Sequence, residues 1–499
     1  MTRSLSSLTS RTFDVLIVGA GVYGAALGLL VSEAGFSVAI IDRADFAGGT
    51  SSNSLKILHG GLRYLQSFDV PRMRSSIRAR REWAQLIPEF VAPLPCAIAT
   101  RGLGLRSAGA LGTALFINEV VSLDRNRGID SACRLPAARL LSSAAYASLT
   151  EGLGVATGSR GALWWDAIAL DTERMVLELL GRAADKGAVV ANYVEATRLL
   201  TTASRVRGVT ALDRESGSEI EILARRVVCA TGALNTEFEQ QPPGKSSQCY
   251  ALNLIVSRDM PSQTALAIAP PDMQGGVMGD LFLVPWKGKT MIGTYYVIDD
   301  GSAAVEQQRK GAAQFLSLAN HALPRWQLTQ ADICFVHWGK LPLDPSWQRG
   351  EPVRLDSRNR LLDGADNGIA GLWSVSGPKF TTALVAARQA LQKVTQNMQP
   401  DASVRSDVAD QSGWLRRMDH ESELSAKAEI AARHLHARHL DDAVLRRTGV
   451  GNDGYPGDAA LDACARGMGR ALNWSDADRQ HEIESLQQHY RDWHFWHNG

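Results

Sequence analysis

A glycine-rich turn directly after an apolar strand most constrains what this chain can fold into. Residues Phe13–Val18 read FDVLIV, the pattern of a fully buried parallel strand, and Gly19-Ala-Gly21-Val-Tyr-Gly24 follows at once. An apolar helical pattern then covers Ala25–Ala34, and a second strand over Phe36–Ile41 ends in Asp42. This order predicts a βαβ unit of the Rossmann type.

Each glycine of this turn has a physical reason. Gly19 permits the tight turn, Gly21 lets the backbone approach a pyrophosphate, and Gly24 lets the helix pack closely on the strand. The free N–H groups and the positive dipole end of the helix then face the phosphates. Asp42 stands where an acid would bind a ribose hydroxyl. A GxGxxG pattern alone is weak in a chain with 45 glycines, but in this context it predicts dinucleotide binding better than it predicts an ordinary turn.

NAD and FAD both bind such a unit, and three features favour FAD. The turn stands near the N-terminus, a loop rich in serine and threonine follows the second strand at Gly48–Ser54, and a second glycine turn at Gly377–Thr382 precedes a late helix. FAD is long and needs two contact regions far apart in sequence. A helix N-terminus at the second turn would stabilise negative charge at the N1/O2 edge of the reduced flavin.

The segment Thr50–Tyr64 reads TSSNSLKILHGGLRY. With the first turn and Ser374–Thr382, it resembles the FAD-dependent glycerol-3-phosphate dehydrogenase family, within the wider D-amino-acid-oxidase-like flavoproteins. That family carries TSSxSSKLIHGGLRYL in the first segment and GGKLTT in the second, whereas Leu55 here replaces a serine and Pro378 a glycine. The resemblance extends to a helical cap at Asp441–Tyr490 and covers nearly the whole chain.

The resemblance implies an α/β fold in which a Rossmann-type FAD-binding domain carries an inserted mixed β-sheet substrate domain and a C-terminal helical cap. The oxidoreductase domain is expected at 12–396, with its substrate part at about 246–349 and its FAD part at about 12–100, 160–245 and 350–396. Residues 397–412 are polar and unpatterned, as in a linker. A C-terminal helical domain is expected at 413–499.

The resemblance also indicates which residues bind the cofactor. They lie in the two glycine turns, in the serine-rich loop and at strand ends. The predicted cofactor residues are Gly19, Gly21, Val22, Tyr23, Gly24, Asp42, Arg43, Thr50, Ser51, Ser52, Ser54, Lys56, His59, Gly60, Gly61, Val194, Ala230, Thr231, Gly232, Gly377, Pro378, Lys379, Phe380 and Thr381. For His59, contact with the flavin and capping of its own loop both stay open. For Lys56, a phosphate contact and a structural role both stay open.

The implied reaction transfers a hydride from a substrate C–H next to oxygen or nitrogen to flavin N5, and electrons then pass to a quinone or to oxygen. The predicted catalytic residues are Lys379, His59, Arg358 and Lys340. Lys379 would sit at the flavin and substrate, and Arg358 would bind a substrate phosphate, for which a bidentate guanidinium is suited. The family's GVRPL is Gly339-Lys-Leu-Pro-Leu343 here, so a second phosphate arginine is missing unless Lys340 replaces it.

Further departures fall on the substrate side. The family's GTTD is Gly293-Thr-Tyr-Tyr296, and its KGSH segment is Ala251-Leu-Asn-Leu254, without the histidine. Tyr295 and Tyr296 alternate along a strand, so only one of them faces the site. An intact cofactor side with an altered substrate side predicts retained flavin chemistry on a changed substrate. Three functions stay open: oxidation of a small CH–OH substrate such as glycerol 3-phosphate or a relative, oxidation of an amine or amino acid, and flavin binding without turnover.

Composition limits the partners. A net charge of +1 provides no field for nucleic acid, so any anion site must be local. The expected partners are a small-molecule substrate and the electron acceptor, and a homodimer is compatible with the resemblance. The polar first dozen residues do not read as a secretory signal, and six cysteines without a CxxC pair indicate reduced thiols, which predicts a cytoplasmic protein.

Two segments have competing interpretations. The apolar stretch Ala108–Val121, beside Arg101 and Arg106, would either contact the inner face of the cell membrane peripherally or form a buried helix. Three histidines, His434, His436 and His439, read as part of a solvated helix, and no metal site is predicted from them.

Overall fold

The parallel sheet expected around the first glycine turn organises the fold. The computed structural model describes residues 3–155, 159–233, 247–269, 277–356, 358–400 and 413–493. Strand β1 (Phe13–Val18) is buried along its whole length, α2 (Val22–Glu33) begins just after the turn, and β2 (Val38–Ile41) pairs in parallel with β1. The predicted βαβ unit is confirmed.

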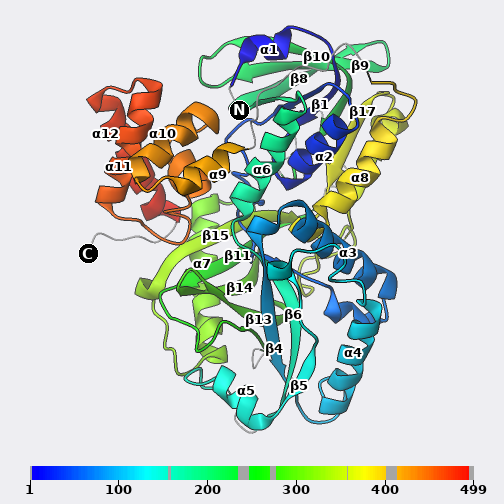
Figure 1. The fold of residues 1–499 in the computed structure, drawn as a ribbon, viewed down its shortest axis with the longest axis vertical. Helices are drawn as coiled ribbons and strands as arrows, with labels where there is room; N and C mark the ends of the chain where they lie inside the picture. The colour runs from blue at the N-terminus through cyan, green and yellow to red at the C-terminus, as the bar shows by residue number, and fades with distance from the viewer. Residues whose placement is uncertain are drawn as a thin grey trace.

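The first sheet has the order β16-β17-β10-β1-β2-β7, and the β8–β9 pair extends from β10. Helix α2 packs beside α6 (Thr172–Asp185) and α8 (Ala383–Val394) in the upper half of Figure 1. The remaining strands of this sheet are β7 (Val189–Ala191), β8 (Val194–Thr202), β9 (Arg205–Asp213), β10 (Glu219–Cys229), β16 (Arg360–Asp363) and β17 (Leu372–Ser376).

Three strands of this sheet end at one edge. Val18 of β1 lies beside Cys229 of β10, and Cys229 lies beside Ser374 of β17, with all three strands parallel. The turns that follow these strands, which begin at Gly19, Ala230 and Gly377, therefore meet at one place. In an open α/β sheet such an edge is where ligands bind.

The second sheet lies below the first in Figure 1 and has the order β15-β11-β14-β13-β12-β4-β6-β3, with β5 on β6. Most pairs are antiparallel, whereas β12 and β4 are parallel, so the sheet is mixed as expected. Helix α7 (Ala304–Ala322) packs on β11 and β14. The strands are β3 (Ile57–Leu58), β4 (Val91–Ala99), β5 (Arg139–Leu141), β6 (Gly161–Ala169), β11 (Gln248–Val256), β12 (Ala265–Ile268), β13 (Val277–Trp286), β14 (Lys289–Ile298) and β15 (Ile333–Pro342).

This sheet reaches beyond the range 246–349 expected for the substrate part. Strands β3, β4, β5 and β6 all precede residue 170, and β4 pairs with β6 from Val91–Ala169 to Ala99–Gly161. The expected division had placed 91–99 and 161–169 with the FAD part. The difference arises because the apolar pattern of a strand shows that it is buried, whereas its partner is chosen by contacts far away in sequence.

The helices between these strands include α3 (Val70–Leu86) and α4 (Ala108–Val121). Along α4 only Leu115 is buried, while Phe116 is 69% exposed and Leu123, just after the helix, is 81% exposed. The interpretation of 108–121 as a buried helix is therefore wrong. The other short helices here are α1 (Leu5–Thr9) and α5 (Ser143–Leu149).

The chain from 413 to 493 is helical, as expected, and packs against α6 and α7. Its elements are α9 (Gly413–His420), α10 (Leu424–His434), the π-helical turn η8 (Asp442–Arg447), α11 (Asp458–Leu472) and α12 (Asp476–Trp493). Its apolar side chains, Leu415 and Leu461 among them, join the core around α2 and α6. Across the described ranges, no helix combines the length and the apolar content that a bilayer crossing requires.

The three late histidines do not share a solvated helix. Helix α10 ends at His434, and His436 has a φ of 58° and is buried. His439 lies between Glu215 and Glu482, 3.2 and 3.0 Å from their carboxylate oxygens. The left-handed backbone at His436 ends the helical register, so the solvated-helix interpretation is wrong for His436 and His439.

Candidate active site

The first glycine turn is shaped by backbone approaches that exclude side chains. A Cβ at Gly19, whose φ is +104°, would lie 2.6 Å from the carbonyl oxygen of Ala230, and a Cβ at Gly24 would overlap the carbonyl oxygen of Gly19. The first turn therefore packs directly on the Ala230-Thr231-Gly232 turn. Gly21 is the N-cap residue of α2 and has no side chain to bond the first N–H groups, so the positive end of the helix faces the turn.

Asp42 at the end of β2 is bound to this turn. Its carboxylate accepts hydrogen bonds from the backbone N–H groups of Ala20 (2.7 Å) and Ala44 (3.0 Å), and its own carbonyl accepts one from Val194 N (2.7 Å). Burial raises the pKa of the Asp42 carboxyl to about 6. Arg43, the next residue, is exposed. Asp42 and Val194 thus share one edge with the glycines.

The serine-rich loop connects the helix to the second sheet. Ser51 Oγ accepts a hydrogen bond from Val22 N at the start of α2 (2.9 Å), and Thr50 Oγ1 donates one to the carbonyl oxygen of Lys340 in β15 (2.8 Å). Ser52 and Ser54 bond within the loop. Ser51 is therefore the hydroxyl that this loop places at the helix N-terminus.

Lys56 is buried and has a full set of partners. Its Nζ lies 3.0 Å from Glu173 Oε1 and donates hydrogen bonds to Thr172 Oγ1 (2.6 Å) and the carbonyl oxygen of Ser52 (2.7 Å). These three acceptors use the three donors of an ammonium group. Of the two roles considered for Lys56, the contacts favour the structural one.

The late glycine turn lies against the first one through Tyr23. The Tyr23 hydroxyl donates a hydrogen bond to the carbonyl oxygen of Lys379 (3.0 Å), and it also lies 3.1 Å from Asn359 Oδ1. A Cβ at Gly377 would overlap this hydroxyl. Phe380 follows and packs on Trp83, whose Nε1 donates to the carbonyl oxygen of Thr381 (3.0 Å). The two glycine turns, far apart in sequence, thus border one site.

The Lys379 side chain leaves this turn toward the HGGLRY segment. Its Nζ donates a hydrogen bond to the Tyr64 hydroxyl and lies 4.7 Å from the centroid of the Tyr64 ring. Burial, followed by the nearby charge of Arg63, lowers the pKa of Lys379 to about 8. Tyr64 and Arg63 were not assigned a role from the sequence, although they stand inside the segment that carries the resemblance.

His59 is held by a buried carboxylate. Its Nδ1 lies 3.2 Å from Asp166 Oδ2, while Asp166 Oδ1 accepts from Gly60 N (2.6 Å) and Arg80 (2.7 Å). Burial opposes ionisation of Asp166, but the bond to His59 and the charge of Arg80 lower its pKa to about 2. The His59 ring packs edge-on against Phe282, 5.6 Å between centroids. Asp166 is a further residue that no sequence pattern singled out.

The predicted phosphate ligands lie on separate elements. Lys340 of β15 pairs with Asp299 (2.7 Å) and stands over the Tyr250 ring (5.4 Å). Arg358 is 69% exposed and only 3.6 Å from Asp356, which pairs more closely with Arg360. Of the two, Lys340 has the closer carboxylate partner, whereas Arg358 shares its carboxylate with Arg360. Ser357, between Asp356 and Arg358, lies outside the described residues.

The two tyrosines of β14 divide as the alternation requires. The Tyr295 ring stacks on Phe315 of α7, 5.2 Å between centroids. Tyr296 points away from that helix, since it lies near Arg63, and burial raises the pKa of its hydroxyl to about 12. Tyr296 is therefore the tyrosine on the side of Arg63 and Lys379.

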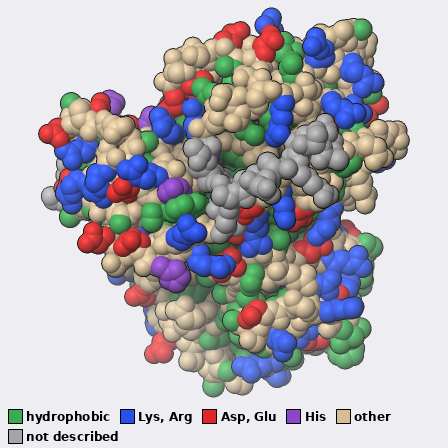
Figure 2. Space-filling model, turned by 45° about the horizontal axis from the view of Figure 1, so that its top comes forward, with side chains coloured by type: hydrophobic (Ala, Val, Ile, Leu, Met, Phe, Trp, Pro, Cys, Tyr) green, Lys and Arg blue, Asp and Glu red, His purple; other side chains and the backbone are tan. Residues whose placement is uncertain are grey.

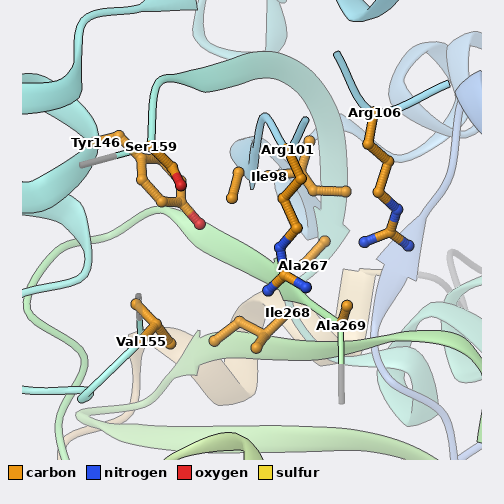
Figure 3. Close-up of a pocket in the computed structure, with 10 residues that line it drawn as sticks. Ile98, Arg101, Arg106, Tyr146, Val155, Ser159, Ala267, Ile268 and Ala269 are labelled. Atoms are coloured by element: carbon orange, nitrogen blue, oxygen red, sulfur yellow. The ribbon is translucent and has the colours of Figure 1, made fainter. Parts of the chain in front are cut away.

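Two cavities lie away from these residues. One of about 20 Å³, lined by Arg101, Arg106 and Tyr146 among others, is at the far end of the second sheet and holds at most a water or two (Figure 3). A groove of about 580 Å³ is lined by Arg205, Arg226 and neighbours beside β9 and β10. Neither contains a residue predicted for cofactor or catalysis, so the convergence of the turns defines the candidate site.

Comparison with known proteins agrees with this geometry. The family described as FAD dependent oxidoreductase (DAO) matches residues 14–392. Glycerol-3-phosphate dehydrogenase 2 of Mycobacterium tuberculosis is 28% identical over 442 residues, 86% of this chain and 72% of that one. Glycerol-3-phosphate dehydrogenase of Synechocystis is 24% identical over 426 residues, 79% and 71% of the two chains.

Solved structures share the fold. The glycerol-3-phosphate dehydrogenase from Bacillus halodurans, complexed with FAD, superposes with a TM-score of 0.70 at 18% identity, covering 99% of this chain and 98% of that one. Glycine oxidase from Geobacillus kaustophilus gives 0.53 at 17% identity, covering 80% and 98%. The family match spans both glycine turns and the strands between them. The chain therefore belongs to the DAO family of FAD dependent oxidoreductases, and the prediction of an FAD enzyme resembling the glycerol-3-phosphate dehydrogenases is confirmed.

Proposed function

We propose that the protein oxidises a small alcohol that carries an anionic group, with glycerol 3-phosphate or a close relative as the substrate class. One observation supports this most: Lys379, which follows the late glycine turn, is held against Tyr64 with Arg63 close by. Lys379 and Arg63 together form a local anion-binding site, which we call the Lys379 corner. Acidic and basic side chains are otherwise interspersed on the face seen in Figure 2, in keeping with a net charge of +1.

The residues around the two turns fit FAD. Backbone atoms line the place where the two glycine turns meet, because Cβ atoms at Gly24 and Gly377 would overlap Gly19 and Tyr23. Asp42 would bind a ribose hydroxyl, and the N-terminus of α2 with Ser51 would bind the pyrophosphate. When bound, FAD supplies flavin N5 as the acceptor of a substrate hydride.

The side chains would divide the remaining work. Lys379 and Arg63 bind the anionic group and so orient the substrate C–H. Alcohol oxidation also releases the hydroxyl proton, which needs a base within hydrogen-bond reach. His59 is our candidate, because Asp166 engages its Nδ1 and leaves Nε2 to accept that proton.

Lys340 and Arg358, the two phosphate ligands predicted from the sequence, would bind a phosphate more weakly than a pair of arginines would. Lys340 already pairs with Asp299, so binding a phosphate would require that ion pair to loosen. Arg358 shares Asp356 with the closer Arg360 and would supply the second cation. We infer that the affinity of this site for a phosphate group is lower than that of a site with two arginines free of other partners.

Amine or amino-acid oxidation is the second candidate, because the same fold is found in the glycine oxidase from Geobacillus kaustophilus. The Lys379 corner favours the first candidate, since an ammonium beside an arginine repels a substrate amine. Flavin binding without turnover is the third. Its expected signature is a flavin spectrum that no alcohol or amine changes.

For the acceptor, we propose a quinone reached at a membrane surface. Exposed apolar side chains gather on α4 and the loops beside it: Phe68, Leu103, Leu105, Phe116, Val120 and Leu123. Helix α4 also packs on the 3₁₀ helix Leu62–Ser67, which carries Tyr64. Exposed apolar side chains that gather in this way mark interaction sites, and an apolar helix with large exposed side chains suits peripheral contact with the inner face of the cell membrane.

A substrate and acceptor panel tests the proposal. Purified holoenzyme is assayed with phosphorylated alcohols, uncharged alcohols, amines and amino acids, each with a soluble quinone or with oxygen. Turnover of phosphorylated alcohols with quinone supports it, whereas turnover of amines alone favours the second candidate. For the membrane surface, co-sedimentation with anionic vesicles should be lost in the Phe116→Asp/Leu123→Asp double variant and kept in Leu170→Asp, which changes an exposed leucine elsewhere.

A further inference from the structure

A short loop links the first glycine turn to the C-terminal helices. Asp42 begins this loop and accepts from Ala20 and Ala44, as described above. Ala47 ends it and donates its N–H to the carbonyl oxygen of Ala20 (3.2 Å). The loop 42–47 is therefore bonded at both ends to Ala20, which stands inside the fingerprint. Any displacement of the loop moves the acid expected on the ribose.

The middle of the loop is anchored by two arginines from η8. Asp45 is 3% exposed and forms ion pairs with both Arg446 and Arg447. Arg447 also donates from Nη2 to Asp45 Oδ1 (2.7 Å) and to the carbonyl oxygen of Leu435 (3.0 Å), and its side chain is fully buried. Asn192 adds a hydrogen bond to Asp45 Oδ1 (3.0 Å). Both charge partners of the Asp45 carboxylate, Arg446 and Arg447, thus come from the C-terminal domain.

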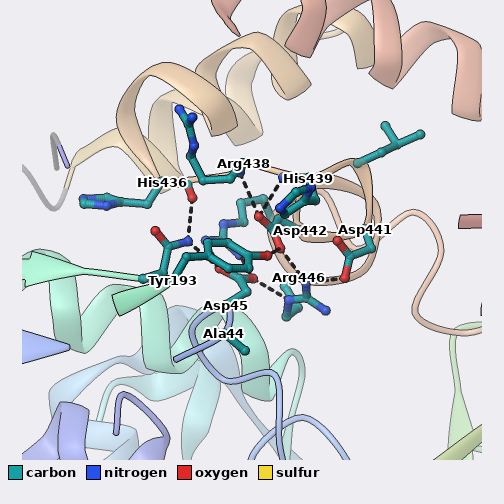
Figure 4. A network of polar contacts seen from close by, with 12 residues as sticks. Ala44, Asp45, Tyr193, His436, Arg438, His439, Asp441, Asp442 and Arg446 are labelled. Carbon is teal, nitrogen blue, oxygen red and sulfur yellow. Dashed lines mark hydrogen bonds and ion pairs between the residues drawn. The ribbon is translucent and has the colours of Figure 1, made fainter. Parts of the chain in front are cut away.

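A second set of contacts supports the first (Figure 4). Arg446 also pairs with Asp441 (2.7 Å) and Asp442 (2.6 Å) of its own turn. The Tyr193 hydroxyl donates to Asp442 Oδ1 (2.8 Å), while Tyr193 N donates to the carbonyl oxygen of Ala44 (3.2 Å). Tyr193 thus contacts the loop with its backbone and the C-terminal domain with its side chain.

These two arginines lie outside the family match, which ends at residue 392. The shared fold can therefore form a dinucleotide site without them. Yet removing Arg446 or Arg447 would take a charge partner from the buried Asp45 carboxylate, which is strongly unfavourable. A connection of this cost, made to the loop that carries Asp42, points to a role beyond holding the domain in place.

We propose that the C-terminal helical domain is a working part of the dinucleotide site, in which Arg446 and Arg447 position the loop 42–47 and so strengthen binding of the adenosine half of FAD. This inference rests on FAD binding, as proposed above. Arg446, Arg447 and Tyr193 are positioning residues, because they act through Asp45 and Ala44. By linkage, FAD binding should in turn stabilise the packing of η8.

The test measures the affinity of apoprotein for FAD and for ADP, which carries the adenosine half alone. Arg447→Lys should weaken both by about tenfold, and Tyr193→Phe both by about threefold, as expected for losing hydrogen bonds to charged groups. The matched control is Asp453→Asn, which removes an ion pair to Lys289 of β14 (2.6 Å) from the same domain without touching the loop. It should leave both affinities unchanged even if it lowers Tm.

Circular dichroism below the unfolding transition confirms that each variant is folded. Folded Arg447→Lys and Tyr193→Phe proteins that bind FAD and ADP like the wild type would overturn the inference. If Arg447→Lys does not fold, hydrogen exchange of the wild-type protein tests the coupling instead. ADP should slow the exchange of backbone amides in 435–449. ADP binding without such protection would refute the coupling. A wild-type protein that binds no FAD would instead refute the proposed function.

Discussion

Lys379 and Tyr64, 315 positions apart in sequence, meet at the edge of the two sheets: Lys379 Nζ donates to the Tyr64 hydroxyl and lies 4.7 Å from the ring centroid. One residue follows the turn after β17, and the other follows His59-Gly60-Gly61. The contact therefore joins the late glycine turn to the segment that leads away from the serine-rich loop. It places a partly desolvated ammonium beside Arg63, where the anionic group of a substrate would bind.

Replacing Lys379 by Met should lower kcat/KM for a phosphorylated substrate by about 100-fold, because a desolvated charge-assisted contact is lost while side-chain length is kept. FAD content, measured from the visible spectrum, should not change. Steady-state kinetics with matched phosphorylated and uncharged alcohols makes the check. If both substrates lose activity equally, the lysine does not bind the anionic group.

The pH dependence of KM should report the same lysine. Its pKa of about 8 means that the amine is charged below that pH and neutral above it. KM for an anionic substrate should therefore stay flat below pH 8 and rise above it. Lys379→Arg should abolish the rise, because a guanidinium stays protonated. Since the folded pKa lies below the ordinary 10.5, this group should also make the protein more stable as pH rises from about 8 to 10.5.

Two glycines of α2 should respond differently to alanine. Gly24→Ala should prevent FAD binding, because its Cβ would overlap the backbone of Gly19, which cannot move without opening the turn. In Gly28→Ala the nearest atom is Ile40 Cδ1, the end of a flexible side chain. This control should keep FAD and lose about 1–3 kcal/mol of stability, as for a modestly overpacked core. Equal FAD binding by the two variants would argue against the fingerprint.

Alanine variants of the two candidate phosphate ligands, Arg358 and Lys340, should differ in KM. Arg358→Ala should raise KM for a phosphorylated substrate by about tenfold, since this guanidinium is largely exposed and shares its carboxylate, Asp356, with the closer Arg360. Lys340→Ala should raise it by no more than about threefold, because Asp299 already holds that ammonium. An unchanged KM in Arg358→Ala would remove this arginine from the substrate site.

Sequence reasoning succeeded where a local pattern carries the geometry. The order strand, glycine turn, helix and acid from Phe13 to Asp42 predicts the βαβ unit because Gly24 lies against Gly19 within the unit and Gly19 lies against the neighbouring Ala230 turn. The late turn at Gly377 could be predicted from its glycine and the helical pattern after it, although the contact that excludes a side chain there is with the distant Tyr23.

What could not be predicted depends on contacts between distant residues. The pairing of β4 with β6 is decided across the sheet, and so is the meeting of Lys379 with Tyr64. Asp45 reads like any polar residue after a strand until η8 places Arg447 against it, 402 positions away. The three late histidines misled because their spacing suggests a helix, whereas the backbone at His436 leaves it.

The most direct test of the account is anaerobic titration of the purified flavoprotein with glycerol 3-phosphate, with glycerol and with a panel of amino acids in parallel. We expect glycerol 3-phosphate to bleach the visible flavin band stoichiometrically and glycerol to do so far less, with the difference lost in Lys379→Met. A flavin that stays oxidised in glycerol 3-phosphate but is bleached by an amino acid would contradict the proposal that the substrate is an anionic alcohol.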